Sequence, residues 1–296
     1  MNHSPLTEDS EKDFEIRSLS GISWDELYAC HSEAFRDYPF QWSREALIRT
    51  VRRRGFDPAL SFGAFQNSTL VSFTWNGLGN FNGLKTAYDT GTGTIGAVRN
   101  KGLASRIFSY AVPILQSAGV KNYLLEVLAE NKSARSVYSR MGFEVSRTFH
   151  CFRTEAAGWH VPARSCPREV EFKKIDFSWK DTMVKMHDFQ LSWQNNFQAL
   201  LKEPSHFVVT GAFLSDRLVG YGMIESDGGD IPQLAVSHDL RGKGIGTELM
   251  RHLRALNRFG TVKIVNVPSD QEHILKFIKR CGMSEIAVQY EMEKRL

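Results

Sequence analysis

Two short stretches decide the fold: Arg99-Asn100-Lys101-Gly102-Leu103-Ala104 and its counterpart Arg241-Gly242-Lys243-Gly244-Ile245-Gly246. Each follows a β-like stretch and leads into an amphipathic helix, expected at about 103–117 and 245–257. The free N–H groups and the positive dipole end of such a helix start favour an anion, most often phosphate. Glycine and other small residues in the turn let the backbone approach the anion closely. The sequence therefore predicts two phosphate-binding loops.

The sequence before each loop is also repeated. Gly63-Ala64-Phe65 with Leu70-Val71 returns as Gly211-Ala212-Phe213 with Leu218-Val219, and a polar turn separates the two parts in both cases. Two apolar runs joined by a short polar turn are typical of a β-hairpin. Each copy is therefore expected to begin its sheet with a hairpin.

The sequence after each loop repeats as well, as an apolar strand, a helix and a Gly-apolar pair. The pairs are Gly142-Phe143 and Gly282-Met283, which lie 40 and 38 residues after the loop glycine. A final alternating strand, near 145–153 and 286–293, is expected to close each copy. Matching elements in the same order indicate two homologous α/β domains.

These repeats set the expected domain boundaries. Residues 1–12 form a loose tail, 13–153 the N-terminal copy, 154–168 a linker, and 169–296 the C-terminal copy. The linker is assigned because it lacks periodicity and contains Gly and two Pro.

Composition narrows the possible partners. Up to residue 160 the chain has 18 basic and 16 acidic side chains, and beyond it 19 and 17, so neither half is a basic module and no nucleic acid is expected. No apolar stretch approaches the ~20 residues of a membrane helix. The polar N-terminus lacks the apolar core of a signal peptide, which favours a cytoplasmic protein. The protein is expected to be a monomer or a homodimer.

The pattern Arg-x-x-Gly-x-Gly/Ala between a strand and a helix resembles the acyl-CoA pyrophosphate loop of the GNAT superfamily of N-acetyltransferases. The resemblance covers nearly the whole chain as a tandem pair. It implies, for each copy, a mixed, twisted, mostly antiparallel sheet that is flanked by helices and splays open between its fourth and fifth strands. Acetyl-CoA would bind there as a cosubstrate. The implied cofactor-binding residues are Thr92, Gly93, Thr94, Arg99, Asn100, Lys101, Gly102, Leu103, Ala104 and Ser105 in the first copy and Leu234, Ala235, Val236, Arg241, Gly242, Lys243, Gly244, Ile245, Gly246 and Thr247 in the second.

The first copy carries a second signature of the superfamily, Asn-x-x-Ala-x-x-x-Tyr-x-x-x-Gly-Phe, at residues 131–143. Ala134 and Tyr138 are four residues apart and share a helix face, and Asn131 can cap that helix. The resemblance implies that Asn131, Ala134 and Tyr138 contact the cofactor. It also implies that the Tyr138 hydroxyl gives a proton to the departing thiolate.

The second copy departs from this signature. Counting back from Gly282, Ile274 and Ile278 occupy the alanine and tyrosine positions. Neither isoleucine can donate a proton, and their bulk predicts a groove filled to form core. The C-terminal copy is therefore expected to be degenerate and the N-terminal copy catalytic.

The attacking amine must also lose a proton, since an alkylamine has a pKa near 10. The superfamily often uses a carboxylate on the fourth strand. The matching position, 14 residues before the loop glycine, is Tyr88 in the first copy and Asp230 in the second, which makes Asp230 a weaker catalytic candidate. Asp89 adjoins Tyr88 but is expected to face the other side of the strand.

The resulting hypothesis is an enzyme that transfers an acetyl group from acetyl-CoA to a primary amine on a small molecule or peptide. The alternative is a non-catalytic acyl-CoA-binding or sensing protein. The run Gly91-x-Gly93-x-x-Gly96-x-Val98 also fits nucleotide-binding glycine loops, but no helix follows at once and no kinase segments are present. Its glycines are expected to leave room for pantetheine. Cys151, His160 and Cys166 match no zinc spacing, and no metal is expected.

Overall fold

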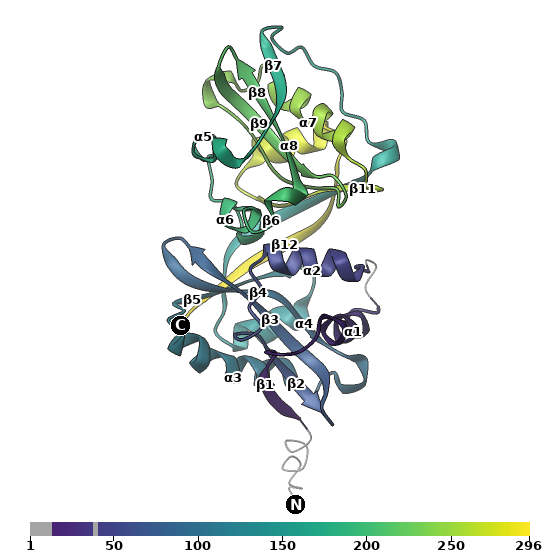
Figure 1. Ribbon diagram of the computed structural model, residues 1–296, viewed down its shortest axis with the longest axis vertical. Helices are drawn as coiled ribbons and strands as arrows, with labels where there is room; N and C mark the ends of the chain where they lie inside the picture. Colours follow the sequence, from purple (N-terminus) through teal and green to yellow (C-terminus); the bar gives the residue numbers. More distant parts are fainter. Residues whose placement is uncertain (1–13, 38–40) are drawn as a thin grey trace, which may run out of the picture. The chain divides into compact units, whose positions relative to one another are not determined.

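The computed structural model describes residues 14–37 and 41–296; the expected tail at 1–12 lies outside them. Contacts divide the chain into two compact units that do not follow the chain in simple order. Unit 1 consists of Met1–Leu125, Ser136–Glu144 and Glu293–Leu296, and unit 2 of Glu126–Arg135 and Val145–Met292. Figure 1 shows the elements of both along the chain.

Unit 1 is built on a five-stranded mixed sheet in the order β1-β2-β3-β4-β5. The strands are β1 (Glu15–Ser18), β2 (Phe62–Gln66), β3 (Thr69–Phe81), β4 (Leu84–Thr94) and β5 (Asn122–Leu128). The predicted hairpin is β2–β3, and its two turn residues, Asn67 and Ser68, have φ of +48° and +65°. Such left-handed turns match the twist of the paired strands.

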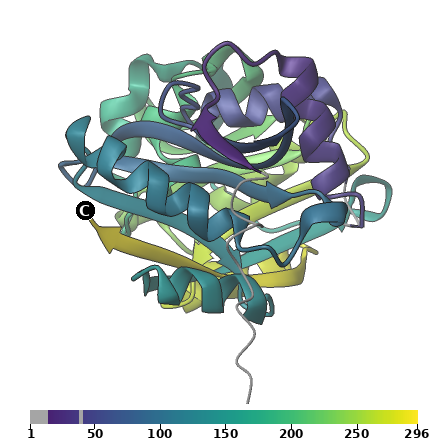
Figure 2. The same ribbon diagram turned by 90° about the horizontal axis from the view of Figure 1, so that it is seen from below.

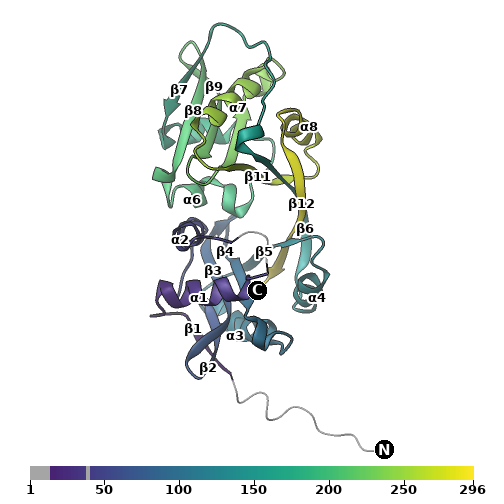
Figure 3. The same ribbon diagram turned by 90° about the vertical axis from the view of Figure 1, so that its right-hand side faces the viewer.

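Helices cover both faces of this sheet. They are α1 (Trp24–Ala34), α2 (Arg44–Arg53), α3 (Leu103–Ser117) and α4 (Lys132–Arg140). Figures 2 and 3 show α1 and α2 on one face and α3 on the other. Phe73 and Trp75 of β3 are buried against α1 and α2, whereas Phe62 of β2 packs on Tyr110 of α3. The alternation of side chains along the strands thus serves two cores.

Unit 2 repeats the design. Its helices are α5 (Lys180–Val184), α6 (Phe197–Leu200), α7 (Ile245–Leu256) and α8 (Glu272–Arg280). Its strands are β7 (Val170–Ile175), β8 (Phe207–Leu214), β9 (Arg217–Glu225), β10 (Asp230–Val236) and β11 (Thr261–Pro268), with β6 (Glu144–Glu155) and β12 (Ser284–Arg295) alongside. Its described buried residues form one core cluster with α7, another with α5 and α6, and a third with α8, β11 and Trp159. The predicted elements are confirmed in both copies.

In both units the parallel strand pair beside the loop separates early. β4 and β5 are paired only over Thr86–Tyr88 and Asn122–Leu124, and β10 and β11 only at Asp230 and Lys263. The sheet opens beyond these points, next to the loops. This is the splay that the resemblance implies.

The closing strands differ from the expectation. β6 was expected to close the N-terminal copy, but it pairs antiparallel with β11 inside unit 2, for example Phe152 with Ile264. The end of β12 belongs to unit 1, where the N–H of Leu296 donates to the carbonyl oxygen of Lys121. The two sequence copies thus exchange their last strands. Periodicity along one chain gives no information about which edge a strand joins.

Candidate functional site

Both predicted loops end in a helix whose first turn lacks a side-chain cap. Gly102 and Gly244 precede α3 and α7 with φ of +70° and +87°, and no described side chain accepts from the first N–H groups of either helix. In α1, by contrast, the Ser23 hydroxyl accepts from the N–H of Glu26 at 3.2 Å. The uncapped N–H groups remain available to a bound anion.

The loop arginines have the same three partners in each copy. Arg99 donates to the carbonyl oxygens of Thr94 and Ala34, at 3.2 and 2.7 Å, and pairs with Asp37. Arg241 donates to the carbonyl oxygens of Val236 and Met186, both at 2.9 Å, and pairs with Asp188. These bonds tie the loop to the strand end and to the end of the first helix or the residues just after it, so the guanidinium groups stabilise the loop.

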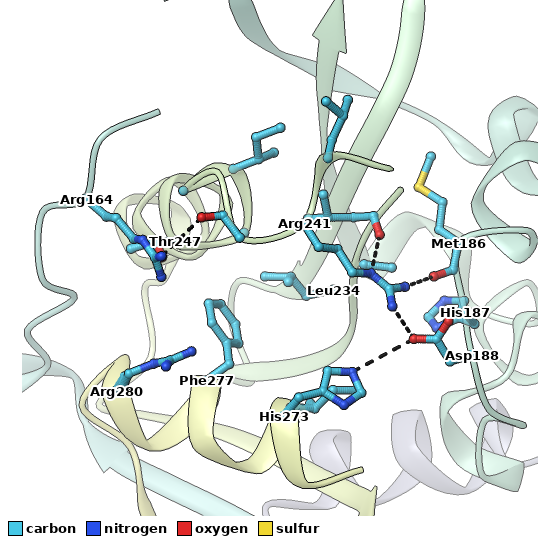
Figure 4. A pocket seen from close by; sticks show the side chains of 18 of the residues that line it. Arg164, Met186, His187, Asp188, Leu234, Arg241, Thr247, His273, Phe277 and Arg280 are labelled. Atoms are coloured by element: carbon cyan, nitrogen blue, oxygen red, sulfur yellow. Dashed lines mark hydrogen bonds and ion pairs between the residues drawn. The ribbon is translucent and has the colours of Figure 1, made fainter. Parts of the chain in front are cut away.

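A cavity of about 310 Å³ opens beside the second loop. Figure 4 shows it between the loop and the start of α7 on one side and α8 on the other, with His273 and Phe277 on the α8 wall. All the cofactor-binding residues predicted for this copy line it except Lys243, which is exposed. Arg164 and Arg280 add positive charge to its lining, which suits a ligand that carries phosphate.

The cavity corrects one expectation. The two isoleucines of the second copy do not fill the groove: Ile278 is buried in the core beneath it, and Ile274 only lines its wall. On a helix the two positions share a face, but α8 is turned so that the deeper residue packs against β11. The groove of the C-terminal copy is therefore open.

A second cavity of about 70 Å³ continues from the first. The two share His187, Phe189, Leu234, Ile274 and Phe277 in their linings. The inner cavity is mostly aliphatic, but Asn195, Gln233 and Asn266 also line it. His187 lies in an aperiodic segment, and nothing in its sequence context singles it out as a site residue.

In the first copy, Tyr138 lies in a small cavity of about 10 Å³, together with Thr92, Ala104 and Asp89. The Tyr138 hydroxyl donates to the Asp89 carboxylate, which also accepts from the Thr92 hydroxyl at 2.7 Å and the N–H of Gly91 at 2.8 Å. Burial raises the pKa of Asp89 to about 6, against the opposing effect of these hydrogen bonds and of Arg54. An acid and a carboxylate thus meet at the splay of β4 and β5.

Asp89 contradicts the expectation that it faces away from the site. The register of β3 and β4 shifts between Trp75–Gly91 and Asn76–Asp89, so Thr90 is an extra residue in β4. With strict alternation Thr92 would share a face with Tyr88, but the bulge brings Asp89 to that face instead. Arg54 donates to the carbonyl oxygen of Thr90 at 3.1 Å and holds the bulge. Apart from the glycines of this strand, nothing in the sequence indicates the bulge.

One of those glycines has a different role from the expected one. A Cβ on Gly93 would lie 2.8 Å from the Phe73 ring and 3.1 Å from Ala34 of α1. Its missing side chain therefore makes room for α1, on the face opposite Thr92, and not for pantetheine.

The remaining predicted residues fall into two groups. Asn131 caps α4 as expected, because its side-chain oxygen accepts from the N–H of Ala134 at 3.0 Å. Asp230 is buried at the start of β10 and lines neither cavity of its copy. The following lie outside the lining of the cavity around Tyr138: Gly93, Thr94, Arg99, Asn100, Lys101, Gly102, Leu103, Ser105, Asn131 and Ala134. Their contact with a cofactor stays a prediction.

The expected linker packs closely on unit 2. Trp159 and Val161 are in the core, and the Trp159 indole N–H donates to the carbonyl oxygen of Cys281 at 2.9 Å. Arg164 donates to the carbonyl oxygen of Gly242 at 3.1 Å, and a Cβ on Gly244 would lie 2.0 Å from the carbonyl oxygen of Ser165. The linker therefore forms part of the wall of the second loop.

The described residues contain no group of three or more His, Cys, Asp or Glu side chains that could hold a metal ion. None of the helices in the described ranges is both long and apolar enough to cross a membrane.

The structure thus shows two α/β units in tandem, each with an uncapped helix start beside the point where its mixed sheet opens. The sequence profile of the acetyltransferase (GNAT) family matches residues 24–143 and 170–283. The chain therefore belongs to this family and carries its domain twice.

Relatives named mycothiol acetyltransferase occur in Streptomyces avermitilis and Streptomyces scabiei, at 30% and 31% identity over 130 and 129 residues. The matches cover 43% of this chain and 42% and 41% of those proteins, about two fifths of their length. 

Solved structures share the fold over nearly the whole chain. A tandem GNAT protein from the clavulanic acid biosynthesis pathway has a TM-score of 0.73 at 13% identity and covers 95% of this chain and 98% of its own. A putative acetyltransferase from Pyrococcus horikoshii has a TM-score of 0.69 at 14% identity and covers 100% of this chain and 93% of its own. At these identities the likeness concerns the fold alone.

Proposed function

We propose that the protein transfers an acetyl group from acetyl-CoA to a primary amine on a small molecule or peptide, by direct attack in a ternary complex. The observation that carries this proposal is the coincidence, in both copies, of an uncapped helix start with an opening strand pair. The helix start would hold the diphosphate and the opening would take the pantetheine arm.

In the N-terminal copy, Tyr138 is the proposed acid. The amine nitrogen attacks the thioester carbon, the C–S bond breaks, and the thiolate takes the proton of the Tyr138 hydroxyl. Asp89 would hold this hydroxyl in place through their hydrogen bond. The proton that the amine loses leaves to solvent, and solvent returns a proton to the Tyr138 oxygen before the next turnover.

The C-terminal copy is proposed to bind acyl-CoA in its open cavity. The alternative of a non-catalytic binding copy is favoured by one observation: Ile231 and Ile278, both buried, occupy the places of Asp89 and Tyr138. No proton donor of the Tyr138 kind is present there.

The test incubates the purified chain with acetyl-CoA and a panel of primary amines, and follows thiol release together with the acetylated product by mass spectrometry. Ala104→Val and Gly246→Val form a matched pair, because both positions follow the loop glycine by two residues and line the cavity of their copy. A Cβ on Gly246 has only ordinary contacts, the nearest at 3.5 Å. We expect Ala104→Val to abolish most turnover and Gly246→Val to spare it. The reverse result would assign catalysis to the C-terminal copy, and no product with any amine would favour the binding protein.

A further inference from the structure

The C-terminal copy contains a buried chain of polar side chains that the proposed mechanism does not use. His187 Nε2 lies 2.5 Å from the Tyr221 hydroxyl, which donates to Gln233 Oε1 at 2.6 Å. Gln233 Nε2 then donates to the carbonyl oxygen of Asn195 at 2.6 Å. Tyr221 is fully buried and Gln233 and Asn195 nearly so. Burying polar groups this deeply costs folding free energy unless each of them makes a hydrogen bond.

The first copy shows that the fold does not need this hydrogen-bonded series of side chains. Phe35 and His187 each follow the residue whose carbonyl accepts from the loop arginine, and Phe73 matches Tyr221 in the hairpin repeat. The Phe35 and Phe73 rings are 6.4 Å apart, and those of His187 and Tyr221 5.9 Å. The same packing is thus apolar in one copy and polar in the other. Since the first copy places two phenylalanines here, packing alone does not require the polar pair of the second copy.

The order of donors fixes the tautomer of His187. A backbone carbonyl can only accept, so the Gln233 amide nitrogen faces Asn195 and its oxygen faces Tyr221. The Tyr221 hydroxyl therefore donates its hydrogen to Gln233, and the Tyr221 oxygen accepts a hydrogen bond from His187 Nε2–H. A neutral imidazole with its proton on Nε2 carries a lone pair on Nδ1.

His187 Nδ1 is the free end of this hydrogen-bonded series of side chains. Among the described residues no protein group bonds to it, and it is not sealed from solvent. His187 lines both the outer and the inner cavity, so it stands where they meet. Burial lowers the pKa of His187 to about 4, with Arg241 acting in the same direction and Asp188 and Gln233 opposing. The ring stays neutral at neutral pH and offers a hydrogen-bond acceptor to the cavity.

We propose that the C-terminal copy also binds a primary amine, and that His187 Nδ1 accepts a hydrogen bond from an N–H of this amine at the junction of the two cavities. That the amine belongs to the class acetylated in the first copy rests on the proposed function; its binding at His187 does not. Tyr221, Gln233 and Asn195 act as positioning residues, because they hold the proton on the opposite nitrogen.

The test measures binding of propylamine, a small N–H donor, by calorimetry and by the ¹⁵N signals of labelled histidine, with and without acetyl-CoA. The measurements use the Ala104→Val background, so that the first copy does not consume acetyl-CoA and amine by turnover. His187→Phe removes the acceptor and introduces the residue type found at the matching place in the first copy. His187→Asn is the matched control, because its carboxamide keeps a polar group near the position of Nδ1.

We expect His187→Phe to weaken propylamine binding on the order of tenfold, the usual effect of one lost hydrogen bond, without changing acetyl-CoA affinity. His187→Asn should restore part of the loss. In the wild type, Nδ1 should show the signal of an unprotonated nitrogen, and propylamine should shift it. Tyr221→Phe should leave the ring in place but mix the two tautomers, and so weaken amine binding less than His187→Phe.

Two outcomes would overturn the proposal. If His187→Phe weakens acetyl-CoA binding and leaves propylamine unaffected, Nδ1 binds a pantetheine amide. If it changes neither affinity, Nδ1 faces water alone. Should the chain acetylate no amine while propylamine binding still depends on His187, the subsite stands and the proposed function fails.

Discussion

At the scale of single residues, Tyr138 and Asp89 carry the proposed chemistry of the first copy. Tyr138→Phe keeps the ring, which packs on Phe143 with centroids 5.8 Å apart, and removes only the hydroxyl. General acid catalysis contributes on the order of 10²- to 10⁴-fold. We expect kcat to fall within or somewhat below that range, since water can partly replace the donor, while acetyl-CoA affinity is unchanged. Tyr110→Phe, at a 42% exposed position on α3, is the control. Wild-type turnover in Tyr138→Phe would make the tyrosine a packing residue.

The raised pKa of Asp89 predicts a pH-dependent stability. Its folded-state pKa of about 6 exceeds the ordinary value of 3.8, so the native state binds the proton more tightly than the unfolded state. Stability from this group is therefore present below pH 3.8 and is lost as pH rises through about 6. Asp89→Asn removes the charge, so its Tm relative to wild type should be higher at neutral than at acid pH. Thermal unfolding across this range measures it, with Asp216→Asn on the exposed β8–β9 turn as control. A pH-independent difference would contradict the assigned pKa.

The sequence predicts the positions of some of these residues but not of others, depending on whether they lie in a motif or in a regular element. Tyr138 lies in a motif with fixed spacing, and its cavity position agrees with that motif. Asp89 could not be found by counting from the loop glycine, because the bulge at Thr90 reverses the parity of the strand. His187 lies in an aperiodic segment, and only the folded chain brings it to Tyr221 and Gln233. Hydrophobic periodicity predicts where the helices and strands lie. It does not predict the irregular backbone that positions Asp89 and His187.

At the scale of elements, the two copies place their polar groups on opposite sides of the opened strand pair. The first has Asp89 and Tyr138 on one side and the Phe35–Phe73 pair on the other. The second has Ile231 and Ile278 where the acid pair lies, and His187 and Tyr221 where the phenylalanines lie. Each copy therefore keeps one polar wall beside the same loop. The sequence-based prediction of a degenerate second copy rests on the position of Tyr138 and does not take this second polar wall into account.

In the second loop, replacement by alanine is expected to cost different amounts of stability at two glycines that have nearly the same backbone conformation. Gly242 and Gly244 have φ of +78° and +87°, but a Cβ on Gly242 meets nothing within 4 Å, whereas one on Gly244 lies 2.0 Å from Ser165. Gly242→Ala should cost about 1–2 kcal/mol, the price of left-handed backbone for alanine. Gly244→Ala should cost a further ~1–3 kcal/mol, because the linker must move. Urea unfolding measures both. Equal losses of unfolding free energy in the two variants would contradict this prediction, because the linker would then move aside at no cost.

At the scale of the whole molecule, the sequence predicts the number and order of elements but not the partners of the last strands. The expected boundaries at 153 and 169 follow the repeat along the chain. The two compact units instead place 145–153 in unit 2 and 293–296 in unit 1. A repeat is detected from the similarity of its copies, and strands with similar patterns can join either copy at little cost in side-chain packing.

This exchange leads to a prediction about cutting the chain. Residues 162–165 are exposed, so a protease site inserted after Ala163 can be cleaved in the folded protein. The first piece would keep β6, whose ladder with β11 includes Phe149–Pro268, Phe152–Ile264 and Glu155–Thr261. The second would keep Glu293–Leu296, where Leu296 bonds to Lys121, Glu293 accepts from Asn122 at 3.3 Å, and Lys294 donates to Met141 at 2.5 Å.

Because each piece completes a core of the other, we expect the cleaved pieces to co-elute in size-exclusion chromatography and to separate only in denaturant. The same two pieces expressed singly should each lack an edge strand and be unstable or aggregate. Their co-expression should restore the complex. Two domains arranged in simple order along the chain would behave oppositely: each piece would fold alone, and the cleaved pieces would separate as two stable monomers without denaturant. Hydrogen exchange at Lys121–Asn122 offers a second readout, since deleting Glu293–Leu296 should expose the start of β5 although it removes residues at the far end of the sequence.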